Sequence, residues 1–215
     1  MMGKKKINFN LYLITDRKLV TRHLSLITVV RQALKGGVIA IQVREKDMKT
    51  RQLLKLSYRM RELTEKYQAK LFINDRFDIA LAVGADGVHL AQSSIPVHVV
   101  RKTVKNRLLL GVSTHSLKEA KEAEKAGADF ITLGPVYQTP SKMQYGKPVG
   151  LETLKRVCRT INTPVFAIGG IRSSRIHEIK KAGSYGAAMI SEIFKANNIK
   201  NKTSEILMKM EESER

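Results

Sequence analysis

Eight short apolar runs, separated by segments of helical periodicity, are the feature that most constrains how this 215-residue chain can fold. Short apolar runs that alternate with helix-period segments are typical of repeated βα units around a parallel sheet. The predicted strands are Leu11 to Thr15, Ala40 to Arg44, Leu71 to Asn74, Gly87 to Leu90, Leu109 to Ser113, Phe130 to Gly134, Val165 to Ile168 and Ala187 to Ser191.

The segments between these runs place apolar residues three to four positions apart, which predicts helices that each bury one face. Several of these helices end at a glycine that can take the left-handed conformation following a helix, as at Gly37, Gly127 and Gly183. Eight βα units favour a single α/β domain, a (β/α)₈ TIM barrel, over an open doubly wound sheet, which has about five or six strands. We expect the barrel to span 1–196, and 197–215 to form a C-terminal helical tail packed on or beside it.

The composition of the chain limits the classes of partner that it can bind. The net charge of +20 suits anionic partners, and we expect small phosphorylated molecules. An RNA-binding protein is a competing interpretation, but the chain has no Trp and only 6% aromatic residues for stacking bases, so we predict no nucleic acid. The single cysteine, Cys158, and the lack of a membrane-length apolar run predict a cytoplasmic protein that binds no membrane. A homo-oligomer is left open.

The second predicted strand carries the most unusual pattern of polar residues. Gln42, Arg44 and Lys46 alternate with Val43 and Glu45, so the first three share one face. In a barrel, the active site forms at the carboxyl ends of the strands. Three long donors there, two of them cationic, suit a pyrophosphate group, which we favour over a charged strand end that frays into solvent.

The third strand ends in Asn74 and Asp75, which places a carboxylate at the top of the barrel. Asp75 can hold Mg²⁺ bridged to an anionic leaving group, and Mg²⁺ is the cofactor that we expect. The alternative is that Asp75 caps the helix that begins near Phe77. Taken alone, the residue favours neither.

A long polar loop follows the sixth strand and leads to Gly150. Thr139, Ser141 and Lys142 in this loop offer two hydroxyls and an ammonium group for a phosphate. Loops of this length are lids or disordered insertions, and we favour a lid.

Two further strand ends offer backbone N–H groups or a hydroxyl to a phosphate: Gly169 and Gly170 after the seventh strand, and Ile190 and Ser191 at the end of the eighth. A tight turn alone would also explain the two glycines. His115, just after the fifth strand, is a candidate acid or base, although a histidine in such a turn is more often structural. His89 is expected to be structural.

Taken together and in order, several motifs resemble the thiamine phosphate synthase family over nearly the whole barrel. These motifs are Gln42-Val43-Arg44-Glu45-Lys46, Asn74-Asp75, Asp86-Gly87-Val88-His89-Leu90, Gly111-Val112-Ser113-Thr114-His115, Gly134-Pro135-Val136-Tyr137 with Thr139 to Lys142, and Ile168-Gly169-Gly170-Ile171. The resemblance implies a transferase of thiamine biosynthesis, which joins hydroxymethylpyrimidine diphosphate to a thiazole phosphate with loss of pyrophosphate and with help from Mg²⁺.

The resemblance also implies a role for each site residue. The pyrimidine diphosphate would be bound by Gln42, Arg44, Lys46, Asn74 and Lys142. The thiazole phosphate would be bound by Thr139, Ser141, Gly170, Ile190 and Ser191. Asp75 would hold the metal, and Ser113 would line the reaction centre. Apart from the resemblance, we also count Lys142 and His115 as candidate catalytic residues.

This chain departs from the family pattern after the fourth strand. The family pattern there is Gly-Gln-x-Asp with a second metal carboxylate, whereas this chain has Ala91, Gln92, Ser93 and Ser94. A hydroxyl binds Mg²⁺ far less strongly than a carboxylate, so weakened metal affinity or a changed reaction follows. The alternatives are a metal-independent thiazole tautomerase that uses His115, or a paralogue that binds phosphate ligands without turnover. The complete set of basic residues favours the synthase.

Overall fold

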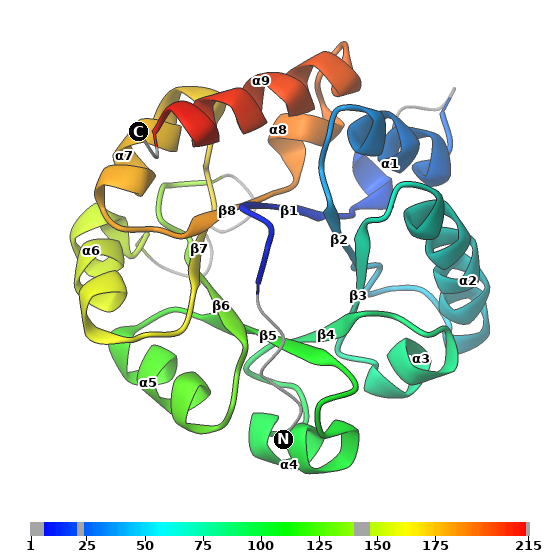
Figure 1. Cartoon of the computed structure of the whole chain (residues 1–215), viewed down its shortest axis with the longest axis horizontal. Coiled ribbons are helices and arrows are strands. Elements are labelled where there is room, and N and C mark those ends of the chain that lie inside the picture. The colour runs from blue at the N-terminus through cyan, green and yellow to red at the C-terminus, as the bar shows by residue number, and fades with distance from the viewer. Residues whose placement is uncertain (1–6, 21–23, 140–146, 214–215) are drawn as a thin grey trace.

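The computed structural model describes residues 7–20, 24–139 and 147–213. Eight parallel strands form a closed barrel in sequence order, and helices surround it (Figure 1). The strands are β1 Leu11–Ile14, β2 Ala40–Val43, β3 Lys70–Asn74, β4 Gly87–Leu90, β5 Leu109–Thr114, β6 Phe130–Leu133, β7 Val165–Ile168 and β8 Gly186–Met189. The predicted (β/α)₈ barrel is therefore confirmed, and each predicted strand begins within one residue of an observed one.

Helices surround the strands, and the last of them lies outside this ring. They are α1 Leu26–Lys35, α2 Thr50–Lys66, α3 Phe77–Ala82, α4 Val97–Val104, α5 Leu117–Lys125, α6 Gly150–Thr160, α7 Ile176–Lys181, α8 Ser191–Phe194 and α9 Ile199–Glu212, with 3₁₀ turns η1 Arg17–Leu19 and η3 Ser173–Arg175. Gly37, Gly127 and Gly183 all have positive φ, as predicted for residues that end helices.

Aromatic side chains fill the interior of the barrel. Tyr12, Phe72, Phe130 and Phe166 are fully buried, and the ring centroids of Tyr12 and Phe72 lie 5.2 Å apart. These rings fit because neighbouring strands carry glycine at facing positions. A Cβ atom on Gly87, for example, would lie 2.4 Å from Cε1 of Phe72. The interior is therefore a packed core, and a ligand has to bind above it.

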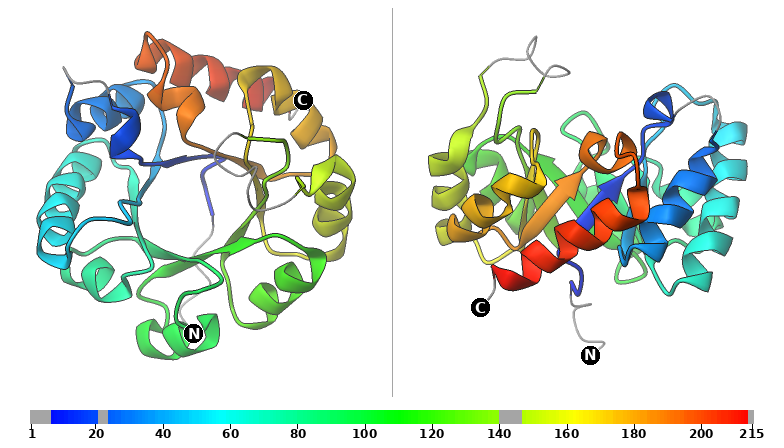
Figure 2. Two further views of the ribbon diagram at one scale, coloured as in Figure 1. Left: turned by 180° about the vertical axis from the view of Figure 1, so that it is seen from behind. Right: turned by 90° about the horizontal axis from the view of Figure 1, so that it is seen from above.

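The two ends of the barrel differ. Phe9, from the segment before β1, closes the lower end and lies 5.3 Å from Phe166 between ring centroids. The loops that follow the strands project from the opposite end, which we call the mouth (Figure 2). The mouth is therefore the open end of the barrel, where side chains from several strands can meet.

The last helix, α9, lies across the outside of the ring and packs against α1, α7 and α8 (Figures 1 and 2). Ser204 Oγ donates a hydrogen bond of 3.0 Å to the carbonyl of Gly36, at the end of α1. In the described parts of the chain, no helix is long and apolar enough to cross a membrane.

Candidate functional site

The end of β2 reaches from the barrel interior to the rim of the mouth. Gln42 is buried, Arg44 is half-buried and Lys46 is exposed, so the three donors form a path from inside to outside. Glu45 is buried and turned away from them, where it accepts a hydrogen bond of 2.7 Å from Thr15 Oγ. Thr15 Oγ in turn accepts from the Arg44 backbone N–H at 3.0 Å. The predicted alternation thus holds for Gln42, Arg44 and Glu45, and Thr15 and Glu45 fix the strand end that carries Arg44.

A line of hydrogen bonds connects β2 to the end of β3. Gln42 Nε2 donates to Asn74 Oδ1 at 2.9 Å, and Asn74 Nδ2 donates to Asp75 Oδ2 at 2.6 Å. Asn74 is therefore oriented on both sides. Gln42 Oε1 is buried and has no partner among the described residues, which leaves one acceptor available to a ligand or a water molecule.

Asp75 has a strained backbone, with φ of 60°, and a carboxylate held from several sides. Ser94 Oγ donates to Asp75 Oδ1, and the Ala91 backbone N–H donates to the same atom at 3.3 Å. The residue that precedes α3 is Arg76, and no side chain of the described residues caps that helix. The helix-capping alternative for Asp75 is therefore wrong, and Ser94 holds the one carboxylate at this strand end.

His89 lies inside the barrel beneath Ser113. Its Nε2 is 3.0 Å from Ser113 Oγ, and complete burial lowers its pKa to about 3. Asp75 opposes this change and Arg44 reinforces it, so both charges act on the interior of the barrel. His89 is therefore a neutral hydrogen-bonding partner that fixes the hydroxyl of Ser113.

Sequence reasoning did not single out Tyr12. Its hydroxyl and His89 Nδ1 are buried without a partner among the described residues, as is Gln42 Oε1. The three side chains come from β1, β4 and β2 and face the barrel interior. Unpartnered buried polar atoms are costly unless a ligand or water pairs with them. A tyrosine at an inward-facing strand position was the available sequence signal.

His115 lies at the start of α5 and is exposed. Its backbone N–H and its Nδ1 both contact Glu119 Oε2, at 2.8 and 3.1 Å. Ser116 Oγ accepts from the Glu119 backbone N–H at 3.2 Å and so caps the start of α5. These contacts tie His115 to the helix, and its predicted role as acid or base stays a prediction.

The loop after β6 runs beside the turn after β7. The backbone N–H of Tyr137 donates to the carbonyl of Gly169 at 3.0 Å. Gly169 and Gly170 have φ of 91° and 67°, and a Cβ atom on Gly169 would lie 2.5 Å from Pro135. Both glycines are therefore required by backbone shape and close approach, whether or not they also bind a phosphate.

The remaining predicted phosphate contacts lie around this turn. Thr139 is half-buried on the β6 loop, and Ser191 is exposed where α8 begins, directly after Ile190. The backbone N–H groups of Gly170 and Ser191 have no acceptor among the described residues. Ser141 and Lys142 lie outside the described residues, as does most of the predicted lid. The structure thus brings the ends of β6, β7 and β8 together at one side of the mouth.

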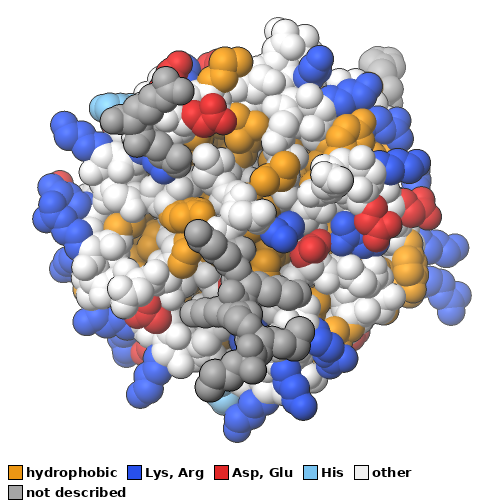
Figure 3. Space-filling view, viewed as in Figure 1, with side chains coloured by type: hydrophobic (Ala, Val, Ile, Leu, Met, Phe, Trp, Pro, Cys, Tyr) orange, Lys and Arg blue, Asp and Glu red, His pale blue; other side chains and the backbone are white. Residues whose placement is uncertain are grey.

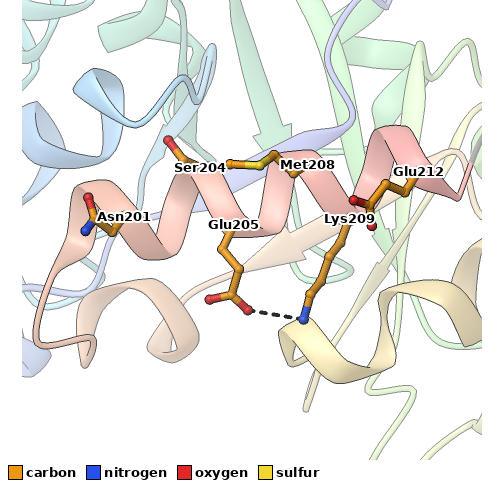
Figure 4. A pocket seen from close by; sticks show the side chains of 6 residues that line it. All are labelled: Asn201, Ser204, Glu205, Met208, Lys209 and Glu212. Carbon is orange, nitrogen blue, oxygen red and sulfur yellow. Dashed lines mark ion pairs between the residues drawn. The ribbon is translucent and has the colours of Figure 1, made fainter.

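A shallow groove on α9 is a different surface. It is lined by Asn201, Ser204, Glu205, Met208, Lys209 and Glu212 (Figure 4). Lys209 and Glu205 form an ion pair of 3.2 Å there, and Met208 is exposed. All of these side chains lie on one outer helix, and none belongs to the strand ends. The groove is not part of the candidate site.

Comparisons with known proteins place this chain in one family. A family model described as thiamine monophosphate synthase matches residues 11–193. A putative thiamine-phosphate synthase of Geobacter sulfurreducens is 50% identical over 188 residues, covering 87% of this chain and 88% of that protein. The thiamine-phosphate synthase of Clostridium novyi is 44% identical over 193 residues, covering 90% and 94%.

A solved structure, titled thiamine phosphate pyrophosphorylase from Pyrococcus furiosus, superimposes with a TM-score of 0.87 at 40% identity. The superposition covers 95% of this chain and 96% of that one. The family predicted from the order of the motifs is therefore confirmed, and this chain belongs to the thiamine monophosphate synthase family.

Proposed function

We propose that this chain is a thiamine phosphate synthase whose mouth binds two phosphorylated substrates side by side. Relatives named as thiamine-phosphate synthases, 40–50% identical over most of their length, support this transferase activity. The observation that carries the proposal is the hydrogen-bonded line from Gln42 through Asn74 to Asp75, with Arg44 and Lys46 beside it.

The pyrimidine diphosphate fits the β2 and β3 side of the mouth. Gln42 and Asn74 offer amide groups at depth, while Arg44 and Lys46 offer cations nearer the rim, where a diphosphate remains hydrated until it binds. Lys142 is assigned to the same substrate by family resemblance. In this arrangement the pyrimidine ring enters first and the diphosphate stays at the rim.

The thiazole phosphate fits the opposite side, where the ends of β6, β7 and β8 meet. The backbone N–H groups of Gly170 and Ser191, which have no acceptor among the described residues, suit phosphate oxygens, and the Thr139 and Ser191 hydroxyls add further contacts. Ser141 is assigned to the same phosphate by family resemblance. Ile190 supplies backbone and apolar contact next to Ser191. In this arrangement the phosphate groups of the two substrates lie apart, and the reacting ends of the two substrates face each other.

The reaction needs little acid or base chemistry from the protein. The thiazole nitrogen forms a new bond to the pyrimidine methylene carbon as the bond from that carbon to the diphosphate oxygen breaks. Negative charge grows on the departing pyrophosphate, and preorganised cations stabilise it there. Ser113, fixed by neutral His89, lines the space between the two substrates.

Mg²⁺ fits this site only together with the diphosphate. Within the described residues, no group of three or more His, Cys, Asp or Glu side chains could hold a metal ion. Mg²⁺ commonly keeps several waters and uses one or two carboxylates plus phosphate oxygens, and Asp75 supplies one such carboxylate. When bound, Mg²⁺ would neutralise charge on the leaving pyrophosphate. Ser94, which donates to Asp75, offers a hydroxyl in place of a second carboxylate.

We propose no nucleic-acid partner for this chain. Figure 3 shows the end of the barrel opposite the mouth, where Lys and Arg side chains are spread around the periphery and Asp and Glu side chains lie among them. Recognition of nucleic acid usually relies on a gathered basic patch. A cytoplasmic location accords with a biosynthetic enzyme that uses soluble phosphorylated substrates.

The proposal is tested by incubating the purified chain with hydroxymethylpyrimidine diphosphate and the thiazole phosphate, with Mg²⁺ or with a chelator, and measuring thiamine phosphate by mass spectrometry. We expect product that requires Mg²⁺ and that falls sharply in Arg44→Ala but not in His98→Ala, an exposed residue of α4. No product in any condition, together with metal-independent isomerisation of the thiazole phosphate carboxylate, would instead indicate the tautomerase.

A further inference from the structure

Three side chains that the proposed chemistry does not use join the loop after β6 to the segment after β7. Tyr137 belongs to the first, Arg175 ends η3, and Glu178 lies in the first turn of α7. The Arg175 guanidinium carbon lies 4.1 Å from the centroid of the Tyr137 ring, and Tyr137 Oη donates to Glu178 Oε2 at 2.6 Å. We call these residues the Tyr137 cluster.

Arg175 holds both segments at once. While it stacks on the Tyr137 ring, its Nη1 donates a hydrogen bond of 2.7 Å to the carbonyl of Gly170. A planar guanidinium can stack and donate in its own plane at the same time, which an ammonium cannot. The Arg175 side chain is thus occupied by the protein itself.

The backbone around the cluster is tightly fitted. Tyr137 N–H donates to Gly169, and a Cβ atom on Gly170 would lie 2.8 Å from Tyr137 Cβ. Burial and the neighbouring Glu178 raise the pKa of Tyr137 to about 12, so its hydroxyl stays a neutral donor. A small change in the Tyr137 ring position would therefore displace the Gly169-Gly170 turn.

We propose that Arg175 is a positioning residue. Through its contacts with Tyr137 and the Gly170 carbonyl, it sets the spacing between the β6 loop and the β7 turn, and this spacing shapes the thiazole phosphate end of the site. This inference rests on the proposed function for the identity of the ligand. The β6 loop carries Thr139 and the β7 turn carries Gly170, so the cluster acts on both groups without touching the substrate.

The kinetic test compares the wild type with Arg175→Gln, Tyr137→Leu, Tyr137→Phe and, as a matched control, Lys181→Ala at the exposed far end of α7. We expect Arg175→Gln and Tyr137→Leu each to raise KM for the thiazole phosphate by roughly tenfold, which is the size expected for a partly buried cation–π contact. KM for the pyrimidine diphosphate should change by less than about twofold. Tyr137→Phe keeps the stacked ring and should stay near the wild type.

Two kinetic results would overturn the proposal. If Arg175→Gln raises this KM and Tyr137→Leu does not, Arg175 binds the phosphate directly. If both substrates lose affinity equally in Arg175→Gln and Tyr137→Leu, the cluster supports the fold in general and not one end of the site.

A second test needs no turnover and separates this inference from the proposed function. Hydrogen exchange of the Val136 and Tyr137 backbone amides in the ligand-free chain should accelerate by roughly tenfold in Arg175→Gln. Loss of the stack loosens the hydrogen bonds that these amides donate to the carbonyls of Ile168 and Gly169. Lys181→Ala should match the wild type. Unchanged exchange in Arg175→Gln would refute the positioning role even if the chain makes thiamine phosphate, and accelerated exchange would support it even if it does not.

Discussion

The burial of His89 predicts a specific loss of stability in mild acid. Its pKa falls from 6.5 to about 3 in the folded chain because burial disfavours the charged imidazolium. Between these two values the unfolded chain binds a proton that the folded chain does not. His89 therefore does not destabilise the folded chain above about pH 6.5, and its destabilising effect grows as the pH falls toward 3.

The size of the effect follows from the two pKa values. At pH 5 the folded state should be less stable than at pH 8 by about 2 kcal/mol from this residue alone. Carboxylates add little in that range. Glu205, whose pKa is lowered to about 2 chiefly by its hydrogen bond from Lys202, begins to matter only as the pH approaches the ordinary value of 4.5.

The assay is urea unfolding at pH 8 and pH 5 for the wild type, His89→Asn and His98→Asn, an exposed histidine that serves as control. The difference between the two pH values should shrink by about 2 kcal/mol in His89→Asn, whatever the absolute stability of that variant, and should be unchanged in His98→Asn. An equal decline in all three proteins would refute the reasoning that His89 is buried in its neutral form.

Three further predictions concern other parts of the molecule. Asp129→Ala should lower the free energy of unfolding by about 3 kcal/mol, because this buried carboxylate pairs with Arg101 at 2.5 Å and accepts from the Leu110 backbone N–H at 2.8 Å. A loss below about 1 kcal/mol in urea unfolding would contradict this prediction. Arg44→Ala should lower kcat/KM by about 100-fold or more while unfolding changes by less than about 1 kcal/mol; equal damage to folding would place Arg44 in the core. Ser94→Asp should tighten Mn²⁺ binding in the presence of pyrophosphate by roughly tenfold, measured by electron paramagnetic resonance; unchanged affinity would show that Ser94 does not face the ion.

The sequence was sufficient for the barrel because each strand is a short apolar run between turn residues, and eight such runs close a parallel sheet. It was also sufficient for the alternation of Gln42, Arg44 and Glu45, since alternation along a strand is local. The buried position of Glu45 follows from the same alternation.

The sequence could not predict contacts between distant loops. Ser94 reaches Asp75 across 19 positions, and Tyr137 reaches Glu178 across 41, and both contacts depend on how neighbouring βα loops lie at the mouth. No periodicity encodes such contacts. The sequence also could not predict that the Tyr12 hydroxyl has no partner among the described residues, because an inward-facing tyrosine is usually an ordinary core aromatic residue.

The measurement that tests the central claim most directly is the stoichiometry of the products in a single turnover. With enzyme in excess and Mg²⁺ present, the account predicts one pyrophosphate released for each thiamine phosphate formed, and no pyrophosphate when the thiazole phosphate is omitted. Pyrophosphate released at the same rate from the pyrimidine diphosphate alone would show hydrolysis without transfer, and would contradict a mouth built to bring two substrates together.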